Sequence, residues 1–434
     1  MSDNVQRSRE KRLSYALIAL CWIVYACSYV GKLSYNANIT QIEAAYGASH
    51  SQAGLVGTMF FFAYGVGQIF NGLLCKRYNL KYVVFSSLIV ASVMNVLVVS
   101  VPDFRFAKYI WLINGAAMSF LWTALIRLLS ETLGTKYLST AIIVMGTTVA
   151  TGTFAVYGLS SLFVAVGSFR TTFFVAGGVL LSVAVIWLTL FGRLTKPLYS
   201  LKNAESAEIG GEAVKSGANG KRVLGKGLLG FFAVIAVFAV MNNFVKDGLT
   251  SWTPGILEGI YATPAWLSIL LTLALPMFAV LGVTLATAMR KKIKNYVLLC
   301  TVLYSGATVL VLTVILLLSY DALAITVIAF ALVACLMASI NNIITSMIPL
   351  KMRDQVDSGR TAGLLNGFCY LGSTLSTYGL GYVAENSGWQ SVLYTLLVLS
   401  GGAAVFGVIC YAVTAWHSKL SYDKTEDNNE KRTK

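Results

Sequence analysis

The run LSYALIALCWIVYACSYVGKLSYN, residues 13–36, decides the fold class of this chain. A helix rises about 1.5 Å per residue, so this run is long enough to cross roughly 30 Å of hydrocarbon. Its apolar part is too long for the core of a secretory signal peptide, and no small-residue cleavage site follows it. We therefore expect the run to remain in the mature protein as a first membrane-spanning helix.

Similar apolar runs recur along the whole chain of 434 residues. Only 12% of the residues are charged and 57% are hydrophobic, whereas about a quarter of the residues in a soluble domain are charged. This composition predicts an all-α membrane protein with twelve transmembrane helices. We expect the spans near residues 13–36, 51–74, 82–101, 107–130, 140–165 and 171–192, and then near 227–251, 262–289, 296–319, 322–350, 361–385 and 390–415.

The spans divide into two sets of six, which predicts two pseudo-symmetric six-helix bundles. Lys32 and Lys246 are 214 residues apart, and Lys136 and Lys351 are 215 apart, as expected for a parallel repeat. Residues 193–226 are polar and rich in Gly, Ser and Lys, so they are predicted to be a flexible linker. The predicted division is a first bundle at 1–192, the linker at 193–226, a second bundle at 227–416 and a tail at 417–434.

The positive charges predict the orientation in the membrane. With the N-terminus inside, 27 Lys and Arg residues fall in the tails, the linker and the inside loops, and three fall outside. Such an asymmetry is typical of loops on the cytoplasmic side. We therefore expect both termini in the cytoplasm, with the chain in the cytoplasmic (inner) membrane. The net charge of +15 then reflects membrane topology and does not indicate a nucleic-acid partner.

Two lysines inside predicted spans are the main candidates for a binding site, because a charge in a span is costly and therefore rare. Tyr25, Tyr29, Lys32 and Asn36 are spaced by 4, 3 and 4 residues, so they form one stripe on a helix. The stripe is typical of a polar cavity wall, although Lys32 alone could also snorkel to the outer surface. Lys246 is the counterpart of Lys32 in the second set.

Asp247 directly follows Lys246, but adjacent helical residues point in different directions. We therefore expect Asp247 to pair across helices or to carry a proton. Arg127, five residues after Trp122 near the cytoplasmic end of the fourth span, is a further candidate that could equally snorkel. Because the spans contain cations and few acids, the predicted cavity should select anions.

The sequence shows no residue pattern typical of a catalytic site or a metal-binding site. The two histidines, His50 and His417, lie outside the predicted spans, and no pair of the seven cysteines has the spacing of a metal site. The spans contain no Ser/His, His/Asp or paired-Asp arrangement. We expect neither enzymatic activity nor a cofactor.

These residues resemble the major facilitator superfamily, and within it the organophosphate:phosphate antiporters, which include glycerol-3-phosphate and hexose-phosphate transporters. The loop Gly72-Leu-Leu-Cys-Lys76-Arg77-Tyr-Asn79-Leu-Lys81 is similar to the superfamily motif Gly-x-x-x-Asp-Arg-x-Gly-Arg, with Lys76 in place of the aspartate. The antiporter family is matched by the helix-1 stripe, by Trp122 with Arg127, by the run from Lys246 to Pro254, and by Tyr370-Leu371-Gly372. The resemblance implies that Lys32 and Lys246 take the place of two arginines that bind the substrate phosphate.

Departures from the family pattern leave the substrate open. Leu33 and Ser251 stand where the family has a lysine and an aspartate that form a salt bridge. Lysine also lacks the forked geometry with which arginine binds a phosphate. A sugar phosphate, another organophosphate and a sugar acid or other carboxylate therefore all remain candidates.

The sequence thus predicts a secondary active transporter that moves a small organic anion by alternating access, working as a monomer in the lipid bilayer. A proton-coupled exporter of drugs or other hydrophobic or cationic solutes is the alternative, and Asp247 is the residue that would support it. A membrane sensor with a transporter-like core would need a sizeable cytoplasmic extension, and the linker and tail are short.

Overall fold

A computed structural model of the chain describes residues 2–74, 77–208, 226–352 and 358–430. Every regular element within those ranges is a helix. Eleven of the described helices are long and apolar enough to cross a membrane, and one of these, Thr361–Val413, is two spans joined at Gly388, where φ is 78° and ψ is 169°. The structure therefore confirms an all-α membrane fold with twelve spans.

The first bundle contains the first half of the chain. Its fifth span is interrupted at Gly146 and Thr147, so that α6 and α7 together cross the bundle. Its helices are α1 (Ser2–Ala37), α2 (Ile39–Tyr46), α3 (His50–Leu74), α4 (Leu80–Val98), the 3-10 helix Phe104–Phe106, α5 (Ala107–Thr132), α6 (Thr135–Met145), α7 (Thr148–Ala165) and α8 (Phe169–Glu208).

The second bundle is built in the same way, with three short helices sharing its second span. Its helices are α9 (Lys226–Tyr261), α10 (Ala265–Thr272), α11 (Ala274–Ala279), α12 (Leu281–Lys292), α13 (Tyr296–Leu316), the 3-10 helix Leu318–Tyr320, α14 (Leu323–Asn342), the π-helical turn Ile343–Met347, α15 (Ile348–Lys351) and α16 (Ser358–Glu430).

Three helices continue past their predicted ends. Helix α9 runs to Tyr261 instead of residue 251, α8 runs to Glu208 instead of 192, and α16 runs to Glu430 instead of 416. Leu, Lys, Ala and Glu in the segment after residue 192 favour helix, so the helix extends beyond the apolar run. The rest of the predicted linker, 209–225, and the loop residue Lys76 lie outside the described residues.

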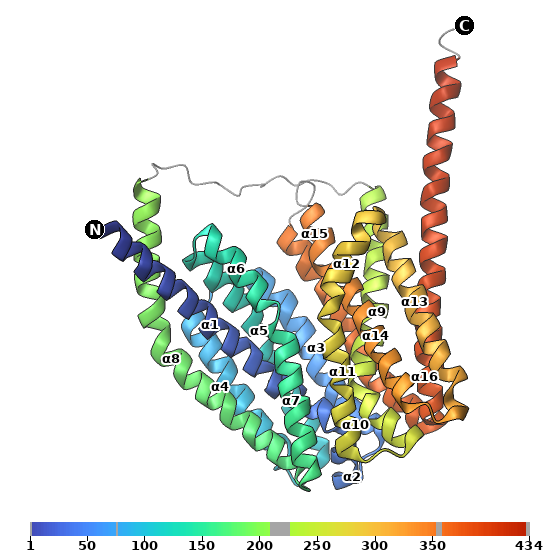
Figure 1. Cartoon of the computed structure of the whole chain (residues 1–434), viewed down its shortest axis with the longest axis horizontal. Coiled ribbons are helices and arrows are strands. Elements are labelled where there is room, and N and C mark those ends of the chain that lie inside the picture. Colours follow the sequence, from blue (N-terminus) through green and yellow to red (C-terminus); the bar gives the residue numbers. More distant parts are fainter. Residues whose placement is uncertain (1, 75–76, 209–225, 353–357, 431–434) are drawn as a thin grey trace.

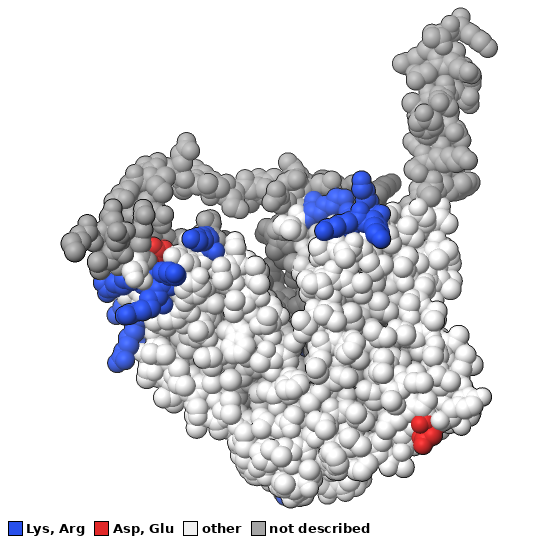
Figure 2. Space-filling view, in the orientation of Figure 1, with Lys and Arg blue, Asp and Glu red and all other residues white. Residues whose placement is uncertain are grey.

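The two bundles lie side by side and lean together at one end (Figure 1). Lys and Arg gather at the other end (Figure 2), on the side where the N and C marks of the chain lie (Figure 1). We call that end the basic end and the opposite one the far end. Between the bundles the surface is hollowed at the basic end (Figure 2).

Among the described residues, seven pairs form hydrogen bonds between the bundles, and all of them lie in the far halves of their helices. We call this contact the seam. The pairs are Asn36–Ser251, Thr40–Glu258, Ser51–Glu385, Thr58–Thr374, Thr58–Tyr378, Tyr157–Thr250 and Ser161–Trp266. The hollow between the bundles is therefore closed at the far end.

Candidate functional site

Lys32 of α1 lies in an aromatic cage between the two bundles. The side chain is buried, with the residue 6% exposed. Its Nζ is 4.1 Å from the ring centroid of Tyr64, 5.0 Å from that of Tyr29 and 5.4 Å from that of Tyr370. Phe60 is a fourth ring, at 5.8 Å. Since Tyr370 belongs to α16, rings from both bundles surround this cation, and each ring face attracts it. Lys32 therefore does not reach the membrane surface.

The other predicted aromatic residues extend the cage. The rings of Tyr25 and Trp122 are 4.8 Å apart, and those of Tyr25 and Tyr29 are 5.5 Å apart. Tyr64 and Tyr370 contact across the bundles at 4.7 Å. Helices α1, α3, α5 and α16 thus build one wall that combines apolar ring faces with phenol hydroxyls.

Lys246 and Asp247 of α9 form an ion pair, with Nζ 3.3 Å from Oδ1. The sequence argument that these neighbours face apart is wrong for the charged groups, because the flexible lysine chain reaches back to the carboxylate. The Asp247 carboxylate also crosses to α16, where it accepts a hydrogen bond from Ser373. Lys32 lies within electrostatic range of both Lys246 and Asp247. Two lysines, one from each bundle, therefore share a region that contains one carboxylate.

Asn36 lies further along α1 than Lys32, on the seam. Its amide donates to the hydroxyl of Ser251 over 2.6 Å, and both residues are buried. The two positions are 215 residues apart, one more than Lys32 and Lys246 on the same two helices. The family's charged pair at positions 33 and 251 is absent here, and Ser251 instead bonds Asn36 across the seam.

Arg127 lies in an ion pair on its own helix. Its Nε is 2.6 Å from Oε1 of Glu131, and Oε2 of the same carboxylate accepts a hydrogen bond of 3.2 Å from Tyr199. Arg127 additionally contacts the carbonyl of Tyr78. These partners join α5 to α8 and to the loop before α4, so a role for Arg127 toward a substrate stays a prediction.

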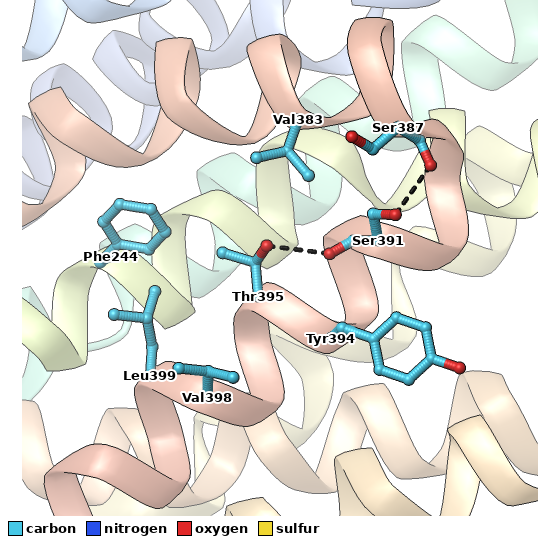
Figure 3. Close-up of a pocket in the computed structure, with 8 residues that line it drawn as sticks. All are labelled: Phe244, Val383, Ser387, Ser391, Tyr394, Thr395, Val398 and Leu399. Atoms are coloured by element: carbon cyan, nitrogen blue, oxygen red, sulfur yellow. Dashed lines mark hydrogen bonds between the residues drawn. The ribbon is translucent and has the colours of Figure 1, made fainter.

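A cavity of about 560 Å³ lies away from these residues, where the two arms of α16 diverge beside Phe244 (Figure 3). Two of its lining hydroxyls are satisfied within the helix: Ser391 donates to the Ser387 carbonyl and Thr395 to that of Ser391. No charged side chain lines it; the lining residues are Phe244, Val383, Ser387, Ser391, Tyr394, Thr395, Val398 and Leu399. The cavity does not contain the features expected of an anion site.

Phe60 and Tyr64 of α3 are site residues that the sequence argument missed. Both are buried and both face the Lys32 ammonium. They lie in an almost uniformly apolar run, so no polar stripe marked them. Their spacing of four residues was the available signal, since it places both rings on one face of a helix.

Comparison with known proteins agrees with this architecture. A 106-residue segment is 30% identical to the membrane sensor protein UhpC of Escherichia coli (strain K12), and equally to UhpC of Salmonella typhimurium. The segment covers 24% of this chain and only 22% of each of those relatives.

Solved structures match over nearly the whole chain at low identity, and therefore support the fold alone. A bacterial homologue of the human lysosomal transporter Spinster, in an inward-facing and occupied conformation, matches with a TM-score of 0.69 and 16% identity, over 92% of this chain and 97% of that one. The nucleoside transporter NupG matches with a TM-score of 0.67 and 14% identity, over 92% and 98%. The family model of the Major Facilitator Superfamily matches residues 21–358. The chain belongs to the Major Facilitator Superfamily.

Proposed function

We propose that this transporter carries a small organic anion, bound between the bundles by Lys32 and Lys246. The observation that supports this most directly is the approach of one lysine from each bundle to a shared region with the Asp247 carboxylate. An ionisable group inside a membrane protein commonly marks the pathway of a solute or an ion. The residues proposed to bind the substrate beside these lysines are Tyr25, Tyr29, Asn36, Trp122 and Tyr370.

The charge of the region favours a singly charged substrate. Two ammonium groups and one carboxylate leave one net positive charge, so a monoanion neutralises the site while a dianion leaves it negative. Lysine binds anions as a point charge and does not require the planar fork that arginine offers to phosphate. The ring faces of the cage suit the C–H faces of a sugar. A sugar acid or a singly ionised sugar phosphate fits these features best.

Alternating access would deliver this substrate to the basic end. The seam closes the far end, and the surface between the bundles is hollowed at the basic end (Figure 2). The distribution of Lys and Arg favours a cytoplasmic basic end. With that orientation, this conformation is inward-facing, and both termini lie on the cytoplasmic side of the inner membrane. We propose that a single chain carries out the cycle.

Uptake into proteoliposomes of the purified chain tests the proposal, with gluconate, glycerol 3-phosphate and glucose 6-phosphate as probes. Lys32→Gln and Lys246→Gln should each lower uptake of the transported probe at least tenfold, since each removes a charge that the anion needs. Lys294→Gln, an exposed lysine outside the region, is the control and should transport normally. Uptake that survives the loss of both charges would refute an anion site and favour the proton-coupled exporter, with Asp247 as its proton carrier.

A sensor is a second candidate, because UhpC, the similar protein in two bacteria, is a membrane sensor protein. A sensor would bind a probe without moving it. Binding measured by ligand-induced thermal shift, together with absent uptake in proteoliposomes, would favour the sensor over the transporter.

A further inference from the structure

A buried carboxylate at the far end has an incomplete set of hydrogen bonds. Glu43 of α2 is 7% exposed. Its Oε2 lies 3.0 Å from Nδ1 of His50, at the start of α3. Its Oε1 is buried and has no hydrogen-bond partner. A buried oxygen without a donor is costly when the carboxylate is ionised, and protonation relieves that cost.

A second carboxylate approaches from the other bundle. Glu258 of α9 accepts a hydrogen bond of 3.0 Å from the hydroxyl of Thr40, across the seam. Glu258 and Glu43 lie within electrostatic range of each other. They are 215 residues apart, close to the offset of 214 between Lys32 and Lys246. The seam therefore brings two acids together from opposite bundles.

Other ionisable groups around this pair come from every neighbouring helix. His50 packs between Trp252 and Trp389, with ring centroids 6.1 and 4.8 Å away. Glu385 of α16 accepts from the amide of Ser51 and lies within electrostatic range of Glu43. Tyr35 of α1 also lies within range of Glu43, and Arg170 of α8 lies over the ring of Tyr46 on α2. Among the described ion pairs, His50 is the basic partner of Glu43.

We propose that Glu43, His50 and Glu258 form a proton-binding site that latches the seam. Protons taken up from water at the far end bind to the carboxylates and the imidazole, and the seam closes. When the protons leave, two like charges on opposite bundles face each other in a buried place, and the seam opens. This latch is independent of the proposed anion site, because none of its groups contacts Lys32 or Lys246.

The direction of the pH effect follows from burial. Burial raises the pKa of Glu43 above its usual value, and the hydrogen bond from His50 only partly offsets this. Opening the seam would hydrate the carboxylate and return its pKa toward normal. The closed seam therefore binds the proton more tightly than the open one. Acidic pH favours closure, and this stabilisation is lost as the pH rises through the raised pKa.

Spin labels on the far end measure the latch directly. We place cysteines at the exposed positions Ala45 on α2 and Asn386 on α16, after changing the partly buried Cys27 and Cys410, and Cys75, to serine. Pulsed EPR on the full chain in nanodiscs, without any substrate, then gives the distance between the bundles from pH 5 to pH 8.5. We expect a short distance at low pH and a growing long-distance population as the pH rises. Release of one proton changes the ratio by up to tenfold per pH unit.

Glu258→Gln imitates a permanently protonated acid, so its seam should stay closed up to pH 8.5. Glu43→Gln should weaken the pH dependence in the same direction, and it provides the test if the first variant does not fold. Asp103→Asn is the control, since this partly exposed aspartate of the far end pairs with Arg105 and should leave the titration unchanged. The proposed latch is wrong if the distance between the bundles does not change with pH in the unaltered chain. It is also wrong if both glutamine variants keep the full pH dependence of that distance. Loss of anion transport with an intact titration would instead count against the proposed function alone.

Discussion

Asp247 offers the sharpest single-residue test of substrate charge. It pairs with Lys246 and is held by Ser373 of the neighbouring helix. Asp247→Asn keeps the shape of the side chain and removes its negative charge, so the net charge of the region rises from one to two. We expect the ratio of kcat/KM for a dianionic phosphate ester to that for a monocarboxylate to rise about tenfold, which corresponds to roughly 1.4 kcal/mol.

Competition kinetics with the two probes in one proteoliposome preparation measures this ratio. Asp321→Asn, which alters an exposed aspartate between α13 and α14, is the matched control. If Asp247 instead carries a proton that drives transport, the variant should lose uphill accumulation of both probes and keep their ratio. That result would contradict a role in charge selection.

At the scale of the helix, apolar run length was enough to predict twelve spans. It could not predict where a helix ends once tertiary contacts take over. The seventh span was expected to stop at residue 251, where the polar run up to Pro254 begins, yet α9 continues to Tyr261. Trp252 is fully buried and donates to the Thr377 carbonyl of α16, so packing stabilises this extra length. Glu258 lies in that extension, which is why the sequence argument overlooked it.

The candidate site, too, could be predicted from the sequence only in part. The spacing of the helix-1 stripe predicted residues that face one way, and Tyr25, Tyr29 and Lys32 do lie together. Helical spacing carries no information about a partner on another helix. The contacts of Lys32 with Tyr370 and of Asp247 with Ser373 depend on how α16 packs against α1, α3 and α9. Those contacts could be found only in the structure.

Close packing of α3 against α16 makes the seam sensitive to a single methyl group. A Cβ added at Gly54 would collide with the backbone carbonyl of Thr377. Gly54→Ala should therefore separate these helices and favour the open seam at any pH. We expect the long-distance EPR population between Ala45 and Asn386 to increase several-fold at pH 5, where the unaltered chain is closed.

Gly178→Ala is the matched control for this change, because a Cβ at Gly178 on α8 meets nothing within 4 Å. It adds the same methyl group to a helix of the same bundle and should leave the distances unchanged. An equally short distance in Gly54→Ala would mean that the two helices shift to accommodate the methyl group without opening the seam.

For the whole molecule, alternating access requires that the seam open in every cycle. The amide of Ser51 and the carboxylate of Glu385 are 3.0 Å apart across the seam, at its outer edge. Cysteines at these two positions therefore lie within reach of a short bifunctional thiol reagent. Cross-linking should abolish uptake almost completely, while a substrate still reaches the site through the hollow at the basic end and still gives a thermal shift. Reductant that cleaves the linker should restore transport.

The same cross-link tests the orientation of the chain. A membrane-impermeant reagent added to intact cells should link the double variant, because the positive charges favour a cytoplasmic basic end and therefore an external seam. Either single variant treated in the same way is the control and should keep its activity. Reaction only after the cells are opened would reverse the orientation. Full transport by the cross-linked protein would mean that the bundles do not separate at this end, because a rigid link across the seam leaves no outward-facing conformation.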